Sequence, residues 1–223
     1  MGAVDTSSLD PDLAGHVRAA LLAVEGVRVD GAGAEQAAAM ADLARELVQR
    51  HAGRPPAQID GLQPARRLYH AIGVDPTRTR PSSEALLRRV LKGQGLPAVN
   101  NAVDAGNELS LRILLSIGLY DLDRIKGPVL LRRGRAGEGY PGIRKEEVHL
   151  EGRLGLFDEA GPFGSPTSDS PRTSVGLETR RLLLVIFAPA DHPRPLLDEA
   201  RELGEVLFSR WCGGQASGHR FLS

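Results

Sequence analysis

Hydrophobic residues recur at helical spacing through the first half of the chain and gather in short, strand-like blocks through the second. The clearest helix is predicted over residues 33–51, where alanines fill most positions between the aliphatic ones. A shorter helix is expected over 62–73, and another begins at Ser82, which suits an N-cap. The other elements expected outside the strand-rich part are a strand over 20–29 and helices over 101–117 and 193–212.

The pattern changes after Gly118, where short apolar runs alternate with turns rich in glycine and proline. Residues 159–176 carry so much Gly, Pro, Ser and Thr that they predict a long loop without regular structure. Helices first, strands next and a closing helix predict an α+β fold, layered like an α/β/α protein, with a mixed β core and flanking helices. We expect residues 1–223 to form a single domain. Strands are expected over 128–133, 146–150, 153–158 and 177–188.

The chain carries 28 Lys and Arg against 28 Asp and Glu, so its formal net charge is zero. This balance argues against a surface that binds nucleic acid throughout, and any contact with a polyanion requires a local basic patch. Two clusters have that composition, and the alternative for each is a solvated helix face or a charged edge strand. The first contains Arg78, Arg80, Arg88, Arg89 and Lys92, and the second contains Arg124, Lys126, Arg132, Arg133 and Arg135.

Motifs of common enzymes are missing: the sequence contains no P-loop, GxGxxG, GxSxG, HExxH or CxxC. Its six histidines are scattered without metal-ligand spacing, so we expect neither a metal site nor a cofactor. The single cysteine, Cys212, fits a reducing compartment and is expected to pack in the closing helix. The longest apolar run, residues 182–190, is too short to span a bilayer, and we expect a cytoplasmic protein without a membrane partner.

A stripe of polar residues runs along the helix expected after residue 100, where Asn100, Asp104 and Asn107 share one face. Asn and Asp are poor residues for the middle of a helix, so their presence requires a reason. They either bind neighbouring loops or recognise a polar ligand, and composition does not separate these interpretations. The segment "SPTSDSPRTS", with its hydroxyls around Asp169 and Arg172, is likewise either a ligand-binding loop or a connector of short turns.

Several segments resemble a known family when taken in order: "RPSSEALLRRVLKGQGLPAVNNAVDAGNELSL", "GLYDLDRIKG", "LLRRGRAGE" and "LFDEAGP". Together they are similar to the B3/B4 domain of the phenylalanyl-tRNA synthetase β subunit, in a free-standing form. The resemblance covers residues 62–190, and it leaves 1–61 as an N-terminal strand and helix extension and 193–212 as a closing helix. It implies a three-layer fold with a polar cavity near its middle, which in the synthetase removes wrong amino acids from mischarged tRNA.

The resemblance also implies which residues line that cavity. Bacterial synthetases carry a histidine three residues before the first Asp of "DLD", where this chain has Gly118. Because that histidine contributes to editing, the synthetase's chemistry does not transfer intact, and without a class II catalytic module the chain is not expected to charge tRNA. The positions that match the family's polar residues are Asn100, Asn101, Asp104, Asn107, Ser110, Asp121, Asp123 and Glu138, and the "DSPRT" segment adds Asp169, Arg172 and Thr173.

Two hypotheses follow. The first is a binding module without synthetase activity that takes RNA, as tRNA or aminoacyl-tRNA, or a small amino-acid-like ligand. The second is a deacylase acting in trans on mischarged tRNA, in which Asp169 or Glu138 positions water and Arg172 stabilises the developing oxyanion. In either case the polar stripe and the "DSPRT" segment are expected to line one cavity. Ligand contacts are assigned to Asn100, Asn101, Asp104, Asn107, Ser110 and Thr173, and RNA contacts to Arg78, Arg80, Arg88, Arg89, Lys92, Arg132 and Arg133.

Overall fold

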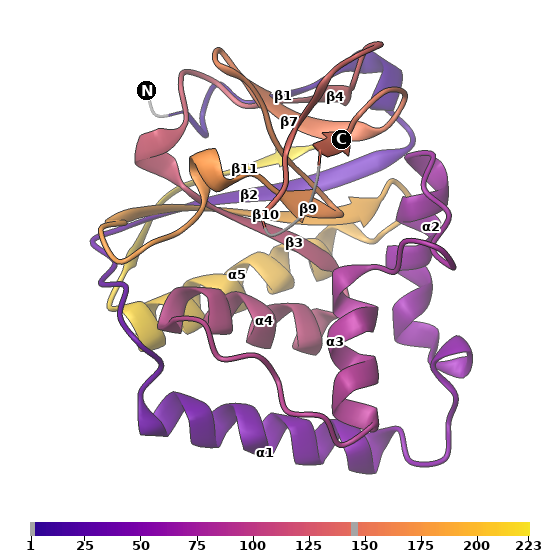
Figure 1. Ribbon diagram of the computed structural model, residues 1–223, viewed down its shortest axis with the longest axis vertical. Coiled ribbons are helices and arrows are strands. Elements are labelled where there is room, and N and C mark those ends of the chain that lie inside the picture. Colours follow the sequence, from indigo (N-terminus) through magenta and orange to yellow (C-terminus); the bar gives the residue numbers. More distant parts are fainter. Residues whose placement is uncertain (1–2, 144–146) are drawn as a thin grey trace.

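A four-stranded antiparallel sheet lies at the centre of the protein (Figure 1). The computed structural model describes residues 3–143 and 147–223. In the sheet, β2 (Val17–Glu25) pairs along its whole length with β10 (Arg181–Pro189). Both strands are buried on both faces, which is why "LLLVIFA" is a continuous apolar run rather than an alternating one. The edges of the sheet are β3 (Ser116–Asp121) and β11 (Gln215–Leu222).

A second sheet covers one face of the first. Its strand order is β1-β4-β7-β8-β9, and it is mixed because β1 runs parallel to β4. Side chains from both sheets, among them Leu21, Val185, Leu156 and Phe163, form the buried core between them. The strands of this sheet are β1 (Ser8–Leu9), β4 (Leu130–Arg133), β7 (Leu154–Asp158), β8 (Gly161–Ser165) and β9 (Ser168–Asp169), and a pair formed by β5 (Gly139–Pro141) and β6 (Glu147–His149) adjoins it.

Helices cover the opposite face of the four-stranded sheet. They are α1 (Ala34–Arg50), α3 (Ser82–Leu91), α4 (Asn101–Ile113) and α5 (Arg194–Cys212), whereas α2 (Gln63–Ala71) packs through Leu68 and Tyr69 into the core between the two sheets.

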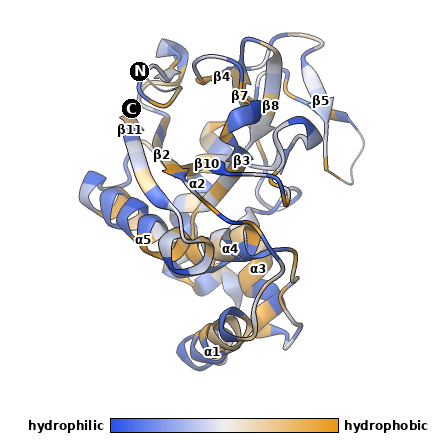
Figure 2. Cartoon of the chain, turned by 90° about the vertical axis from the view of Figure 1, so that its left-hand side faces the viewer, coloured by the Kyte–Doolittle hydropathy of each residue, from blue (hydrophilic) through white to orange (hydrophobic). Residues whose placement is uncertain are grey.

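Of these helices, α4 and α5 pack directly on the sheet through residues such as Leu109 and Phe208. Beyond α4, on the side away from the sheets, α1 packs against α3 (Figures 1 and 2). Cys212 is buried at the end of α5, and burial raises the pKa of its thiol to about 12. The α+β class with a mixed β core and flanking helices is confirmed, and the layers are helices, four-stranded sheet and five-stranded sheet.

Two expected helix boundaries are wrong. α4 ends at Ile113 rather than at residue 117, because Leu114 adopts a left-handed conformation with φ of 55° and turns the chain into β3. Ile117 therefore belongs to a strand. At the start of α3 the N-cap position is occupied by Pro81, and no side-chain cap forms there, so Ser82 is the first helical residue.

The long loop expected over residues 159–176 is also wrong, because β8 and β9 lie within it. The pattern hides β8, whose sequence "GPFGS" offers a single large apolar side chain, Phe163. The strands expected over 20–29, 128–133, 153–158 and 177–188 are confirmed with shifted ends, and residue 146 of the remaining one lies outside the described residues. In the part of the chain that the structure describes, no helix is long and apolar enough to cross a membrane.

Candidate functional site

Two buried tyrosines hold the segment that follows β8. The hydroxyl of Tyr69, on α2, donates a hydrogen bond of 2.6 Å to the carbonyl of Pro166. The hydroxyl of Tyr140, on β5, donates one of 2.5 Å to the carbonyl of Ser168 and lies 3.0 Å from Ser165 Oγ. The first half of the "SPTSDSPRTS" segment is therefore fixed from two sides of the fold rather than left as an open loop.

The third tyrosine of the chain, Tyr120 on β3, fills the space between two glycines. Its ring packs edge-on against Phe163, with centroids 5.0 Å apart. A Cβ atom built on Gly118 would lie 2.7 Å from ring carbons of Tyr120 and closer still to its hydroxyl, and a Cβ on Gly164 would meet the same ring at the same distance. Real Cβ atoms do not approach carbon so closely, so the phenol of Tyr120 excludes any side chain at position 118.

Asp169 brings a negative charge to this tyrosine cluster, which comprises Tyr69, Tyr120 and Tyr140. Burial raises the pKa of Tyr69 to about 12 and raises the pKa of Tyr120 and Tyr140 above the ordinary range, and the charge of Asp169 adds to all three increases. The phenols consequently stay protonated at neutral pH and act as hydrogen-bond donors, not as bases. The cluster is a set of protonated phenols near one carboxylate, and two of them donate to backbone carbonyls.

Around the stripe of Asn100, Asp104 and Asn107, the family resemblance adds Asn101 and Ser110, and most of these five side chains bind the protein's own backbone. Asn100 is the N-cap of the helix, and its Oδ1 accepts a hydrogen bond of 2.8 Å from the amide of Val103. Asn101 is buried, and its side-chain amide donates to two backbone carbonyls, one before α1 and one in α5. The hydroxyl of Ser110 donates to the carbonyl of Leu115, which helps to end the helix. The hydrogen bonds of these side chains link α4 to neighbouring segments of the backbone.

The other two residues of the stripe differ from each other. Asp104 is buried, accepts a 3.1 Å hydrogen bond from the amide of Val99 and lines a cavity beside α1. Asn107 is half-buried, and no hydrogen bond of its side chain is found among residues 3–143 and 147–223. The next residue, Glu108, is the buried acid of this turn and accepts a hydrogen bond of 2.9 Å from Trp211 Nε1.

The groups expected to assist hydrolysis are held by partners of their own. Arg172 makes two hydrogen bonds of 2.9 Å to the carboxylate of Asp158. Glu138 accepts two, of 2.6 and 2.8 Å, from Arg132, and this guanidinium lowers the pKa of Glu138 to about 2. Thr173 is fully buried. The described residues contain no group of three or more His, Cys, Asp and Glu side chains that could hold a metal ion.

The helix that carries most of the stripe, α4, and the second sheet lie on opposite faces of the four-stranded sheet. α4 packs on the face that it shares with α5, whereas Phe163, beside the tyrosine cluster, lies on the face that meets the second sheet. In Figure 1 the two groups of elements stand on opposite sides of β2 and β10. In the described part of the chain, the cavity that Asp104 lines includes no residue of the "DSPRT" segment, so one cavity shared by the stripe and this segment stays a prediction.

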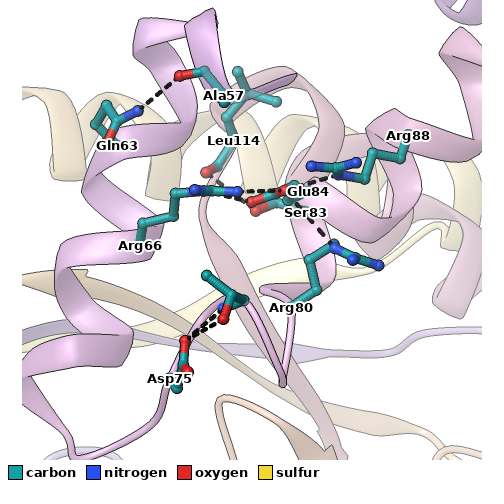
Figure 3. A network of polar contacts seen from close by, with 10 residues as sticks. Ala57, Gln63, Arg66, Asp75, Arg80, Ser83, Glu84, Arg88 and Leu114 are labelled. Carbon is teal, nitrogen blue, oxygen red and sulfur yellow. Dashed lines mark hydrogen bonds and ion pairs between the residues drawn. The ribbon is translucent and has the colours of Figure 1, made fainter. Parts of the chain in front are cut away.

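Three arginines converge on one buried acid, Glu84, at the start of α3 (Figure 3). Arg66 and Arg88 each approach its carboxylate to 2.8 Å, and Arg80 lies 3.9 Å away. Burial by itself would raise the pKa of Glu84, but the hydrogen bonds from Arg66 and Arg88 outweigh it and hold the pKa below its ordinary value. Arg66 lies outside the basic clusters that the sequence indicates.

The remaining basic residues fall into two groups. Arg78 and Lys92 are exposed. Arg89 is exposed as well but donates to a backbone carbonyl of the loop after α3. Arg133 is half-buried and donates to the carbonyl of Ala71 over 3.1 Å. Arg78 and Lys92 are therefore the members of the first cluster that the fold leaves most available to a ligand.

Residues 64–192, more than half of the chain, match the B3/4 domain family. The chain belongs to that family. It is 30% identical over 113 residues to the phenylalanine–tRNA ligase beta subunit of Leifsonia xyli, a match that covers 49% of this chain and 13% of that subunit. The beta subunit of Chromobacterium violaceum is 28% identical over 155 residues, or 67% of this chain and 19% of the subunit. The chain thus spans less than a fifth of the length of these relatives.

Among solved structures, an N-terminal fragment of the phenylalanyl-tRNA synthetase beta subunit from Pyrococcus horikoshii aligns with a TM-score of 0.47 and 16% identity. The alignment covers 98% of this chain and 50% of the fragment.

Sequence reasoning missed the residues that shape this B3/4 domain's interior, Tyr120 and Glu84 above all. The composition shows that tyrosine is scarce, with three in the chain. In the structure all three lie around residues 164–169. Their meeting is not visible in the sequence, since α2, β3 and β5 are far apart along the chain.

Proposed function

We propose that this protein is a B3/4 module that binds tRNA through an arginine surface and does not hydrolyse the ester that joins an amino acid to the tRNA. The position of α2 carries this proposal. Arg66, in its first half, reaches the acid at the centre of the first cluster, and Ala71, its last residue, accepts a hydrogen bond from Arg133 of the second cluster. The two positions are about 7.5 Å apart along the helix axis. Two basic clusters that are separate in sequence therefore meet at one helix.

This surface carries more positive charge than the fold requires. Glu84 is a single carboxylate, and the three guanidinium groups around it leave an excess of positive charge. The side chain of Arg78 is 89% exposed, and its distance of 3.8 Å from Asp75 makes a weak ion pair. Guanidinium groups bind phosphate through two parallel hydrogen bonds, which suits contact with an RNA backbone. We define the arginine surface as Arg66, Arg78, Arg80, Arg88 and Arg133.

The geometry at Gly118 supports binding rather than hydrolysis. The bacterial synthetase domains that this one resembles carry a histidine at that position, and here the ring of Tyr120 occupies the space that any side chain there would need. The carboxylate of Glu138 accepts hydrogen bonds from Arg132 and from the amide of Arg135, and the guanidinium of Arg172 donates two to Asp158. Neither group is free to bind water or an oxyanion without breaking its ion pair.

Filter binding of uncharged and aminoacylated tRNA at two salt concentrations tests the proposal. A decrease in affinity with rising salt is expected, because phosphate contacts release counterions. Replacement of both Arg78 and Arg80 by Gln should weaken binding and lower the slope of log affinity against log salt by about 2, roughly one unit per contact. Arg210→Gln, which removes an exposed guanidinium from α5, serves as the matched control and should leave binding unchanged.

Two results would overturn this function. If tRNA binds with the same affinity at both salt concentrations, or if the double variant binds as tightly as the wild type, the arginine surface is not an RNA site. If the wild type releases amino acids from mischarged tRNA faster than buffer does, the protein is a deacylase, and the inference drawn from Gly118 fails.

A further inference from the structure

A cavity of about 590 Å³ lies between α1, α3 and the loop of residues 93–98. Its volume falls in the range of about 300–1,000 Å³ that is usual for small-molecule sites. The cavity is distant in the fold from the tyrosine cluster, because α4 and the four-stranded sheet stand between them. Its wall is mainly apolar and includes Ala37, Met40, Ala41, Ala44, Val48, Val90 and Leu96.

Two charged side chains line the cavity: Arg45 is exposed and pairs with Asp42, whereas Asp104 is almost completely buried, with 4% of the residue exposed. Its Oδ1 accepts the hydrogen bond from the amide of Val99, and within the described part of the chain no donor bonds to Oδ2 and no cation pairs with the carboxylate. Asp104 lies in the first turn of α4, where the helix dipole favours a negative charge but does not replace a counterion. Burial raises the pKa of this carboxyl group, and the hydrogen bond from Val99 only partly opposes the rise.

The hydrogen bond from the amide of Val99 gives a structural role to Oδ1 of Asp104 but none to Oδ2. Asn in place of Asp would accept the same hydrogen bond from Val99 without the cost of a buried charge. A carboxylate in the wall of an apolar cavity suits a ligand that has both a positive charge and an apolar body. The outer wall belongs to α1, which precedes the residues that match the B3/4 family, whereas Asp104 and residues 93–98 lie within them.

We propose that this cavity binds a small molecule that carries a primary ammonium group on an apolar body. The ammonium group pairs with the carboxylate of Asp104, and the apolar body lies along Met40 and Val48 on α1 and Val90 on α3. Binding therefore joins α1 to the helices of the family domain. The site is independent of the arginine surface and of its proposed role in tRNA binding.

Titration of the full chain with n-hexylamine and with n-hexanol, followed by amide NMR shifts, tests this site. The two probes have the same chain length and differ in the positive charge. Saturable shifts in α1, α3 and residues 93–98 are expected for the amine, with an affinity at least tenfold higher than for the alcohol.

Three variants locate the interaction. Asp104→Asn keeps the acceptor for Val99 and should weaken amine binding tenfold or more, until it matches the alcohol. Ala41→Leu narrows the cavity from an exposed position on α1 and should weaken both probes, which keeps the test valid if Asp104→Asn disturbs folding. Glu46→Gln removes an exposed carboxylate of α1 that pairs with Arg50, outside the cavity wall, and is the control, with unchanged binding expected.

The proposal is overturned if the wild type shows no saturable shift with the amine, or if both probes bind equally. It is also overturned if Asp104→Asn retains the affinity of the wild type for the amine. Failure of tRNA binding has no bearing on these outcomes, since the probes and the residues are different.

Discussion

The close approach of the Tyr120 ring to Gly118 explains why this domain has no side chain at position 118, and substitution of Gly118 tests this explanation. In Gly118→Ala, the new methyl group would lie 2.7 Å from ring carbons of Tyr120, in a buried strand. The backbone at Gly118 is not in the left-handed region, so the substitution adds crowding and no conformational strain. Overpacking of this kind costs about 1–3 kcal/mol. For a chain of this length, each kcal/mol lowers Tm by about 2–4 °C.

A double-mutant cycle assigns that loss to the ring. Tyr120→Ala removes a buried aromatic side chain and by itself costs about 3–5 kcal/mol. In the double variant the methyl group introduced at position 118 has the vacated space, so the combined loss should be smaller than the sum of the single losses by at least about 1 kcal/mol. Urea unfolding followed by circular dichroism measures all four corners of the cycle. Gly31→Ala, at a position with no heavy atom within 4 Å of the new methyl group, is the control and should leave stability unchanged.

Strict additivity in this cycle would refute the reasoning. So would a Gly118→Ala protein as stable as the wild type, because the ring of Tyr120 would then move aside at no cost. In that case the ring of Tyr120 would not be the reason that position 118 lacks a side chain.

Three further changes probe the polar contacts of the fold. Glu84→Gln removes the charge that three arginines share, and thermal unfolding should show a loss somewhat below the roughly 3–5 kcal/mol of a fully buried pair, since the guanidinium groups keep partial access to water. Asn101→Ala leaves two buried carbonyls and one amide without their partner and should cost about 2–3 kcal/mol in urea unfolding, whereas a stability equal to the wild type would exclude its role as a tie. Because the pKa of Glu138 is lowered to about 2 by Arg132, its contribution is present above the ordinary pKa of about 4.3 and is lost as pH falls toward 2. The stability difference between the wild type and Glu138→Gln should therefore shrink between about pH 4.5 and 2, and a constant difference would contradict it.

Regular elements with a strong periodic signal could be predicted from the sequence. α1 and α5 are long and amphipathic, and β10 is a long apolar run. The pattern of each is strong enough to identify the element without knowledge of its tertiary contacts. Short strands could not be predicted in the same way. β8 contains Gly164 because the ring of Tyr120, on another sheet, leaves no room for a side chain there. When contact with a residue far away in the sequence requires a glycine, the strand loses a side chain from its hydrophobic pattern and becomes harder to predict.

The candidate site shows the same limit for polar residues. The family resemblance assigns Asn101 to the polar residues of the helix, and the residue is buried with three hydrogen bonds to backbone groups. Its partners lie before α1 and in α5, at sequence separations of up to 110 residues, so no local pattern shows that they are backbone groups rather than a ligand. Glu84 is a further case, because the arginine that approaches it from α2 is 18 residues away.

The different locations of the proposed sites make the proposals easier to distinguish. The arginine surface lies on α2, α3 and β4, the tyrosine cluster lies between the two sheets, and the cavity of Asp104 lies between α1 and α3. Side chains in these places share no hydrogen bond or ion pair among the residues described here, and distant sites without shared partners contribute additively. Combining the Arg78 and Arg80 substitutions with Asp104→Asn should therefore reduce tRNA binding and amine binding each by the amount seen alone. A loss of tRNA affinity caused by Asp104→Asn would instead mean that α3 couples the two surfaces, and that the ammonium site regulates RNA binding.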